Sequence, residues 1–139
     1  MNTPTSGYSG TPLDRKLGFK EGYRALFVSP PEEFVDSLGL AAAVEVLAAG
    51  DNSPVDLSVL FVRSLEELED GFTPIAGRLA PAGMLWVAWP KRSSGVKTDL
   101  TENVVRDYGL STGLVDVKVC AIDETWSGLK FVIRVKDRK

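Results

Sequence analysis

The loop over residues 91–98 carries the side chains best suited to binding a ligand. It combines three cations, two serines and a glycine, and it joins a buried apolar strand to a capped helix. In open α/β sheets, ligands bind beyond the carboxyl ends of such strands. Cations, hydroxyls and helix N–H groups can together hold a small anion such as phosphate or carboxylate. The candidate ligand-binding residues of this loop and its helix cap are Lys91, Arg92, Ser93, Ser94, Lys97, Thr98 and Asp99.

Plainer interpretations of this loop stay open. A basic surface loop is often only solvated, and exposed charges of this kind contribute little to stability. Asp99, as the expected N-cap of the following helix, would itself occupy the helix N–H groups that an anion needs.

A second candidate segment is the turn over residues 123–128, in which Glu124 and Trp126 could contact a ligand or a partner. A tryptophan in a hairpin turn can serve as a contact residue, or it can fold back over the core. Asp123 and Glu124 could form a carboxylate pair, but neighbours in a strand-end turn usually point apart, as in a solvated turn.

The residue types that are missing exclude several kinds of chemistry. The chain has no histidine, which removes His-dependent triads, His-based metal sites and the commonest general base. Cys120 lies in an apolar strand-like run, where a small buried residue is expected rather than a nucleophile. We therefore expect no metal and no bound cofactor.

The composition is that of one ordinary globular domain. Its 139 residues are 44% hydrophobic and 25% charged, with a formal net charge of −3. This balance gives no field for nucleic acid, and no apolar run is long enough to span a membrane. The first residues lack the basic and apolar parts of a signal peptide, and one cysteine suits a reducing compartment, so we expect a cytoplasmic protein. We expect a loose arm over residues 1–10 and a single domain over 11–139.

The positions that the elements must take follow from caps and periodicity. Apolar spacing and cap residues predict helices over 12–17, 30–37 (capped by Ser29), 65–79 (capped by Ser64) and 100–108 (capped by Asp99). Apolar runs predict strands over 23–28, 56–62 and 84–89, and a terminal hairpin of 114–122 with 129–135. Residues 40–49 are ambiguous between helix and strand, and we interpret 43–47 as an edge strand. Alternating strands and helices predict an α/β fold: a three-layer, Rossmann-like, mostly parallel sheet of about six strands with a C-terminal antiparallel hairpin.

Two resemblances follow from short motifs. The motif Leu17-Gly18-Phe19-Lys20-Glu21-Gly22 precedes the first strand, Leu79-Ala80-Pro81-Ala82-Gly83 precedes Trp86, and the chain ends as strand, loop and strand. This order resembles a shortened class I S-adenosylmethionine-dependent methyltransferase. Four segments, 7–13, 86–91, 98–102 and 123–129, more closely resemble a family of short bacterial proteins known only as a domain of unknown function. The second resemblance implies no activity.

The methyltransferase resemblance implies a cofactor site that the residues do not supply. Such enzymes place a glycine turn after the first strand and an acidic residue after the second. Here the first strand runs into Ser29-Pro30-Pro31-Glu32-Glu33, which offers few N–H donors and two carboxylates. Glu45 is the acidic candidate near the second strand, although it lies within the run and suits a solvated edge.

These observations favour a non-enzymatic binding or interaction module with a degenerate methyltransferase-like fold, which binds a small anionic ligand or a protein. The alternative is an enzyme, a divergent methyltransferase-like transferase that uses the same loops. Self-association through the edge strand over 44–47 is a third hypothesis.

Overall fold

The computed structural model describes residues 12–40, 44–48 and 50–138. The arm predicted over residues 1–10 lies outside these ranges. The helices are α1 (Leu13–Leu17), α2 (Phe34–Ser37), α3 (Leu65–Ala76) and α4 (Glu102–Ser111), with short 3-10 helices η1 (Arg92–Ser94) and η2 (Val135–Asp137). The strands are β1 (Arg24–Val28), β2 (Glu45–Val46), β3 (Val55–Phe61), β4 (Leu79–Pro90), β5 (Leu114–Ala121) and β6 (Trp126–Ile133). None of the helices in the described ranges is long and apolar enough to cross a membrane.

The strands form one six-stranded sheet in the order β2-β1-β3-β4-β6-β5. β2, β1, β3 and β4 pair in parallel, whereas β6 runs antiparallel to both β4 and β5. The predicted α/β fold with a terminal antiparallel hairpin is confirmed. The strand order turns back between β1 and β3. Because β1, β3 and β4 run parallel, their carboxyl ends share one edge of the sheet. Ligands of open α/β sheets bind at this edge.

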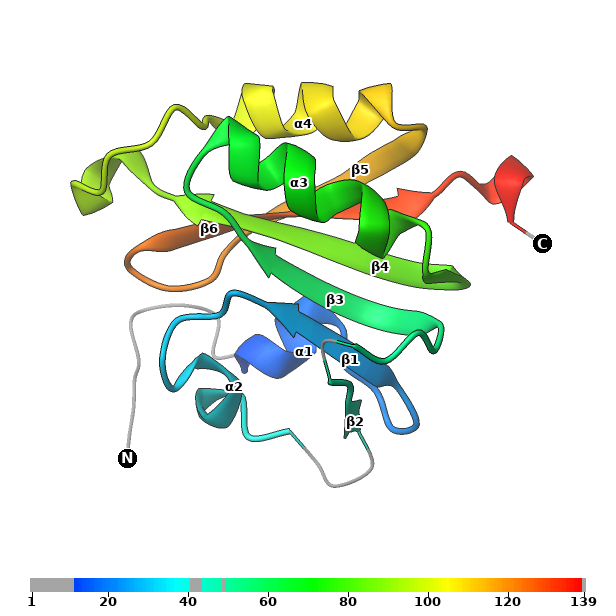
Figure 1. The fold of residues 1–139 in the computed structure, drawn as a ribbon. Coiled ribbons are helices and arrows are strands. Elements are labelled where there is room, and N and C mark those ends of the chain that lie inside the picture. The colour runs from blue at the N-terminus through cyan, green and yellow to red at the C-terminus, as the bar shows by residue number, and fades with distance from the viewer. Residues whose placement is uncertain (1–11, 41–43, 49, 139) are drawn as a thin grey trace.

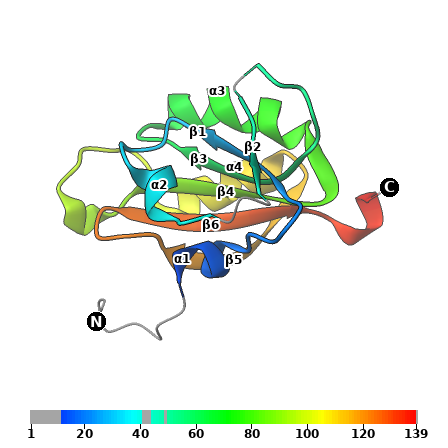
Figure 2. The ribbon, with the colours of Figure 1, turned by 90° about the horizontal axis from the view of Figure 1, so that it is seen from below.

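Helices cover both faces of the sheet (Figures 1 and 2). α3 and α4 lie on one face, over a core that contains Phe72, Val105 and Phe131. α1 and α2 lie on the other face, over a core that contains Leu17 and Trp86. We name these the α3/α4 face and the α1/α2 face. Burial of each large apolar side chain contributes about 1.5–3 kcal/mol to the stability of the folded state, so both cores stabilise the sheet.

The two tryptophans of β4 point to opposite faces of the sheet. Trp86 belongs to the core of the α1/α2 face and Trp89 to that of the α3/α4 face. They stand three residues apart in one strand, and successive strand residues point to opposite faces. The indole nitrogen of Trp86 donates a hydrogen bond to the carbonyl oxygen of Leu17 at 2.8 Å, which attaches α1 to the sheet.

The second predicted helix is shorter than expected. Ser29 has a φ of 55° and does not cap it, and α2 begins only at Phe34, after Glu33 with a φ of 70°. The residue before a proline is pushed away from helical angles, so consecutive prolines at 30 and 31 prevent a helix from starting there. The edge strand predicted over 43–47 is confirmed for Glu45–Val46, and residues 41–43 and 49 lie outside the described residues.

The boundary between α3 and β4 also differs from the prediction. α3 ends at Ala76 rather than at 79, and Leu79 instead pairs with Val55 as the first residue of β4. The next paired residues are Leu57 and Met84, so the proline and glycine of this stretch form an irregular excursion within the strand. Pairing with β3 in the interior of the sheet is the tertiary contact that outweighs the helical spacing of Leu79.

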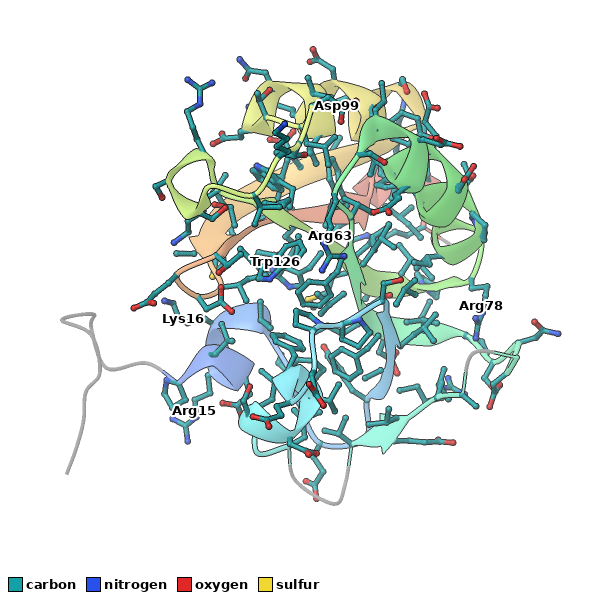
Figure 3. All side chains as sticks on the ribbon, turned by 60° about the vertical axis from the view of Figure 1, so that its left-hand side comes forward. Arg15, Lys16, Arg63, Arg78, Asp99 and Trp126 are labelled. Atoms are coloured by element: carbon teal, nitrogen blue, oxygen red, sulfur yellow. The ribbon has the colours of Figure 1, made fainter. Side chains whose placement is uncertain are left out.

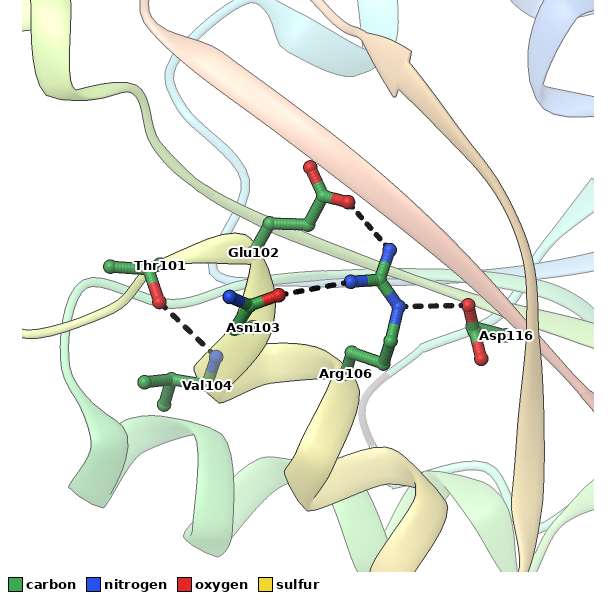
Figure 4. Close-up of polar contacts among 6 residues, drawn as sticks. All are labelled: Thr101, Glu102, Asn103, Val104, Arg106 and Asp116. Carbon is green, nitrogen blue, oxygen red and sulfur yellow. Dashed lines mark hydrogen bonds and ion pairs between the residues drawn. The ribbon is translucent and has the colours of Figure 1, made fainter.

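Two further predictions are wrong at their boundaries. Asp99 is not the N-cap of α4, because Thr101 takes that place and its Oγ1 accepts from the Val104 N–H at 3.2 Å (Figure 4). β6 starts at Trp126 rather than at 129, because the Asp123 carboxylate accepts from the N–H groups of Thr125 and Trp126 and closes the turn early.

Candidate ligand-binding groove

An open groove lies on the α3/α4 face at the carboxyl ends of β3 and β4, with a volume of about 1000 Å³. Its walls come from the residues after β3, from the end of β4 and its following loop, and from the start of α4. Ser127 of β6 also lines it. This volume suits a small-molecule ligand. We call this feature the strand-end groove.

The loop between β4 and α4 is attached to the end of β3 by two side chains. Thr98 Oγ1 donates to the carbonyl oxygen of Arg63 at 2.7 Å, and Asp99 Oδ1 accepts from the Leu65 N–H at 2.9 Å. Asp99 therefore satisfies a free N–H of α3 instead of one of α4. These two bonds join segments that lie more than thirty residues apart and hold the groove in shape.

Arg63 is a groove residue that the sequence interpretation missed. Its backbone N–H donates to Glu67 Oε1 at 2.7 Å, and its carbonyl accepts from Thr98. Its guanidinium carbon lies 5.1 Å from the ring centroid of Trp126, within range of a cation–π contact (Figure 3). Its position directly after a buried strand is the signal that could have found it, because side chains at that place reach the ligand edge.

The groove is lined by more positive than negative side chains. Its cations are Arg63, Lys91, Arg92 and Lys97, and its acids are Asp99 and Glu102. Glu102 forms an ion pair with Arg106, which also pairs with Asp116 at 3.0 Å (Figure 4). The hydrogen bonds that Arg106 donates to Glu102 and then to Asp116 raise the pKa of Arg106. Because Glu102 is already paired, the groove keeps a positive excess.

The structure brings together five of the predicted site residues. Lys91, Arg92, Lys97, Thr98 and Asp99 all line the strand-end groove. The cap of α4 is Thr101 rather than the expected Asp99, so Thr101 is the residue that occupies an N–H group of this helix.

The remaining predicted site residues do not line the groove. Ser93 and Ser94 lie in η1, where the Ser94 hydroxyl donates to the Lys91 carbonyl at 2.6 Å and supports the loop. Glu124 is exposed in the turn before β6. Trp126 is 5% exposed and packs against Phe61, so the alternative in which it folds back over the core is confirmed.

Comparison with known proteins identifies the fold. No protein-family model and no curated protein matches the chain. Among solved structures, it is similar to fibrillarin from Aeropyrum pernix in complex with natively bound S-adenosyl-L-methionine, at 17% identity over 91% of this chain and 70% of that one, with a TM-score of 0.55. The precorrin-6y C5,15-methyltransferase of Geobacter metallireducens matches at 10% identity over 88% of this chain and 86% of that one, with a TM-score of 0.56. A TehB-like SAM-dependent methyltransferase from Corynebacterium glutamicum matches at 10% identity over 92% and 90%, with a TM-score of 0.54. The fold is that of the class I methyltransferases.

These neighbours contradict the leading hypothesis from the sequence. A non-enzymatic binding or interaction module does not fit a fold whose neighbours are described as methyltransferases. The alternative, a divergent transferase, fits these neighbours better.

The turn after β1 does not fit S-adenosylmethionine, the cofactor that this fold implies. Pro30 and Pro31 have no N–H to donate, and the exposed Glu32 and Glu33 would repel the carboxylate of the cofactor. The acid expected after the second strand is also missing from its place, because Glu45 is exposed within β2 itself, on the edge of the sheet.

Aromatic rings fill the α1/α2 face beside this turn. The ring centroids of Phe27 and Phe34 are 6.0 Å apart, those of Phe34 and Phe61 are 4.8 Å apart, and those of Phe61 and Trp126 are 5.1 Å apart. All four residues belong to the packed core of that face. A group bound between these rings would have to displace them.

Cys120 carries no sign of activation. It is 8% exposed, and burial raises the pKa of its thiol, which outweighs the lowering effect of nearby lysines. A raised pKa leaves the thiol protonated and weakly nucleophilic, so the interpretation of Cys120 as a packing residue agrees with its surroundings.

Proposed function

We propose that this protein is a divergent methyltransferase-like transferase whose substrate is an anionic small molecule bound in the strand-end groove. The observation that carries the proposal is the groove itself, which lies at the carboxyl ends of β3 and β4 and has a positive excess. The shared fold with methyltransferases supports an enzyme, and the packed rings of the α1/α2 face favour a ligand on the other side of the sheet.

The residues of the groove have distinct tasks in this proposal. Arg63, Lys91, Arg92 and Lys97 attract and orient the negative group, since charge-assisted hydrogen bonds are stronger than neutral ones. Thr98 and Asp99 hold the loop against β3 and so fix the distances between these cations. Positioning of this kind is a large part of the rate enhancement of transferases.

A screen of many small molecules for enzymatic conversion tests the proposal without assuming which compound donates the transferred group. The wild-type protein would be incubated with a small-molecule extract, with and without added S-adenosylmethionine, and products would be followed by mass spectrometry. We expect at least one anionic compound to change mass, and we expect the conversion to disappear in the triple variant Lys91→Gln, Arg92→Gln and Lys97→Gln. The matched control removes three cations outside the groove, by Arg15→Gln, Lys20→Gln and Lys136→Gln. If neither the wild type nor the control variant converts any compound, the result would contradict an enzymatic role.

We further propose a cytoplasmic location and membership in the short bacterial family, on the motifs over 7–13, 86–91, 98–102 and 123–129. Cell fractionation tests the location. Self-association through β2 is also a proposal. β2 forms an edge of the sheet and its Val46 is 51% exposed, and light scattering on the purified protein would measure the oligomeric state.

A further inference from the structure

Four cations gather around the strand-end groove from two distant parts of the chain. Arg63 follows β3, whereas Lys91, Arg92 and Lys97 follow β4. Within the described residues, none of the four has a carboxylate oxygen within ion-pair distance. Like charges repel when they converge on a concave, partly desolvated surface. A bound group with more than one negative charge would remove this repulsion.

Arg63 is held ready for such a group. Glu67 fixes its N–H, Thr98 fixes its carbonyl, and Trp126 lies under its guanidinium. Trp126 is itself held in place, because its ring meets Phe61 edge to face and its backbone N–H donates to the Asp123 carboxylate. A planar guanidinium that is already placed loses little entropy when it forms two parallel hydrogen bonds to an oxyanion.

The groove also offers apolar surface next to its cations. Trp89, Pro90 and Leu100 are buried lining residues, and Val96 is 38% exposed in the loop. Small-molecule sites in proteins commonly combine apolar walls with a few charged groups that orient the ligand. A free inorganic ion would leave this apolar part of the groove unused.

We propose that the groove binds a phosphate monoester, with its phosphate on Arg63 and the loop cations and its apolar body against Trp89 and Val96. A phosphate monoester carries close to two negative charges at neutral pH, which matches the positive excess better than one carboxylate does. The second negative charge distinguishes the two, since the fork of Arg63 can pair with carboxylate or phosphate oxygens but only the phosphate has further charge for the loop cations. The inference rests on the proposed function and specifies its substrate class.

Calorimetric titration of the full chain at low ionic strength tests the inference with four probes. We expect phenyl phosphate to bind, inorganic phosphate and benzoate to bind more weakly, and phenol not to bind. Arg63→Gln should weaken phenyl phosphate binding about tenfold, whereas the matched control Lys136→Gln should change it by less than about twofold. Salt at about 0.1 M or above should also weaken binding, because groove charges are screened. Equal affinity for phenyl phosphate and benzoate, or no effect of Arg63→Gln, would overturn the inference.

Backbone amide shifts in nitrogen-15 spectra locate the bound probe. Shifts are expected at residues 63–65 and 89–101, and shifts confined to other segments would overturn the inference. Vesicles that contain phosphatidic acid present the same phosphate chemistry on a lipid. We expect the protein not to sediment with these vesicles. If the wild type sediments with them and Arg63→Gln does not, the ligand of the groove would be a lipid headgroup and not a small molecule.

The two proposals fail in distinguishable ways. Binding of phenyl phosphate without any conversion of small molecules would contradict the transferase and leave the substrate class supported. Conversion of an anion that carries no phosphate, together with failure of phenyl phosphate to bind, would overturn the substrate class and leave the transferase supported.

Discussion

The two faces of the sheet differ at the edge where β1, β3 and β4 end. On the α1/α2 face, this edge is packed with the rings of Phe27, Phe34, Phe61 and Trp126. On the α3/α4 face, the same edge opens into a groove with a positive excess. Both faces belong to one sheet, so the comparison shows that the same strand ends can be packed on one face and open on the other.

Trp126 connects the two regions. Its ring closes the aromatic row on one face, and the guanidinium of Arg63 lies over that ring at the mouth of the groove. The packed face thus supports a cation of the open face. A change that loosens the rings is expected to reach the groove through this contact.

The largest effect is expected from Phe61→Ala, which breaks the packed face. Phe61 is 2% exposed and meets both Phe34 and Trp126 edge to face. Removal of a buried ring leaves a cavity and lowers the free energy of unfolding by about 3–5 kcal/mol. Urea denaturation would measure the loss. The control Val46→Ala changes a side chain that is 51% exposed and should shift the midpoint little. A similar loss in both variants would show that the row of rings is not a specific core.

Gly109→Ala disturbs the open face where α4 packs on the sheet. A Cβ at position 109 would overlap a ring carbon of Phe131, so either α4 or the buried ring must move. Overpacking of this kind costs about 1–3 kcal/mol. The matched control is Gly77→Ala, whose Cβ would meet only ordinary contacts. Thermal unfolding should separate the two variants, and equal melting temperatures would contradict close packing of α4 on the sheet.

Asp99→Ala should detach the loop of the groove from α3. It removes the acceptor of the Leu65 N–H, which lies 2.9 Å from Asp99 Oδ1, and the loss of such a helix-end bond costs about 1 kcal/mol. Asp99→Asn is the matched variant, because it removes the charge and keeps the acceptor oxygen. Chemical denaturation should show the full loss for alanine and a smaller one for asparagine. The same loss in both would mean that the charge, and not the bond, stabilises this end of α3.

Lys118→Thr should stabilise the α1/α2 face slightly. Lys118 lies directly opposite Lys130 on neighbouring strands, and like charges at such positions repel, so the expected gain is about 0.5 kcal/mol. Lys130 keeps its place over the Trp86 ring, at 5.9 Å from the centroid. A differential scanning measurement near neutral pH would detect a small rise in melting temperature.

The gain from Lys118→Thr should depend on pH with a defined sign. Burial, and then Lys118, lower the pKa of Lys130 from its ordinary value of 10.5. Between the lowered pKa and 10.5, unfolding takes up a proton, so the free energy of unfolding of the wild type rises with pH in that window. The advantage of the variant is therefore largest below the window and shrinks as pH approaches 10.5. A gain that grows with pH would contradict repulsion as its cause.

The α/β class, the central strand and the loop that lines the strand-end groove could all be predicted from the sequence. Apolar runs and alternating elements predict these features because burial and helical periodicity are local properties of the chain. The same local signals placed Lys91, Arg92 and Lys97 after a buried strand, where the structure finds them in the groove.

The side of the sheet that is open, and the residues that complete the strand-end groove, depend on tertiary contacts. Arg63 and the loop after β4 come together through bonds between segments more than thirty residues apart, which no local pattern contains. Asp99 bonds to Leu65 rather than capping its own helix, because a packed neighbour offered a free N–H at a suitable distance. Leu79 is a strand residue because it pairs with Val55, and Trp126 is a core residue in a strand that pairs with β4. Pairing with distant strands outweighs the local preference of a single position.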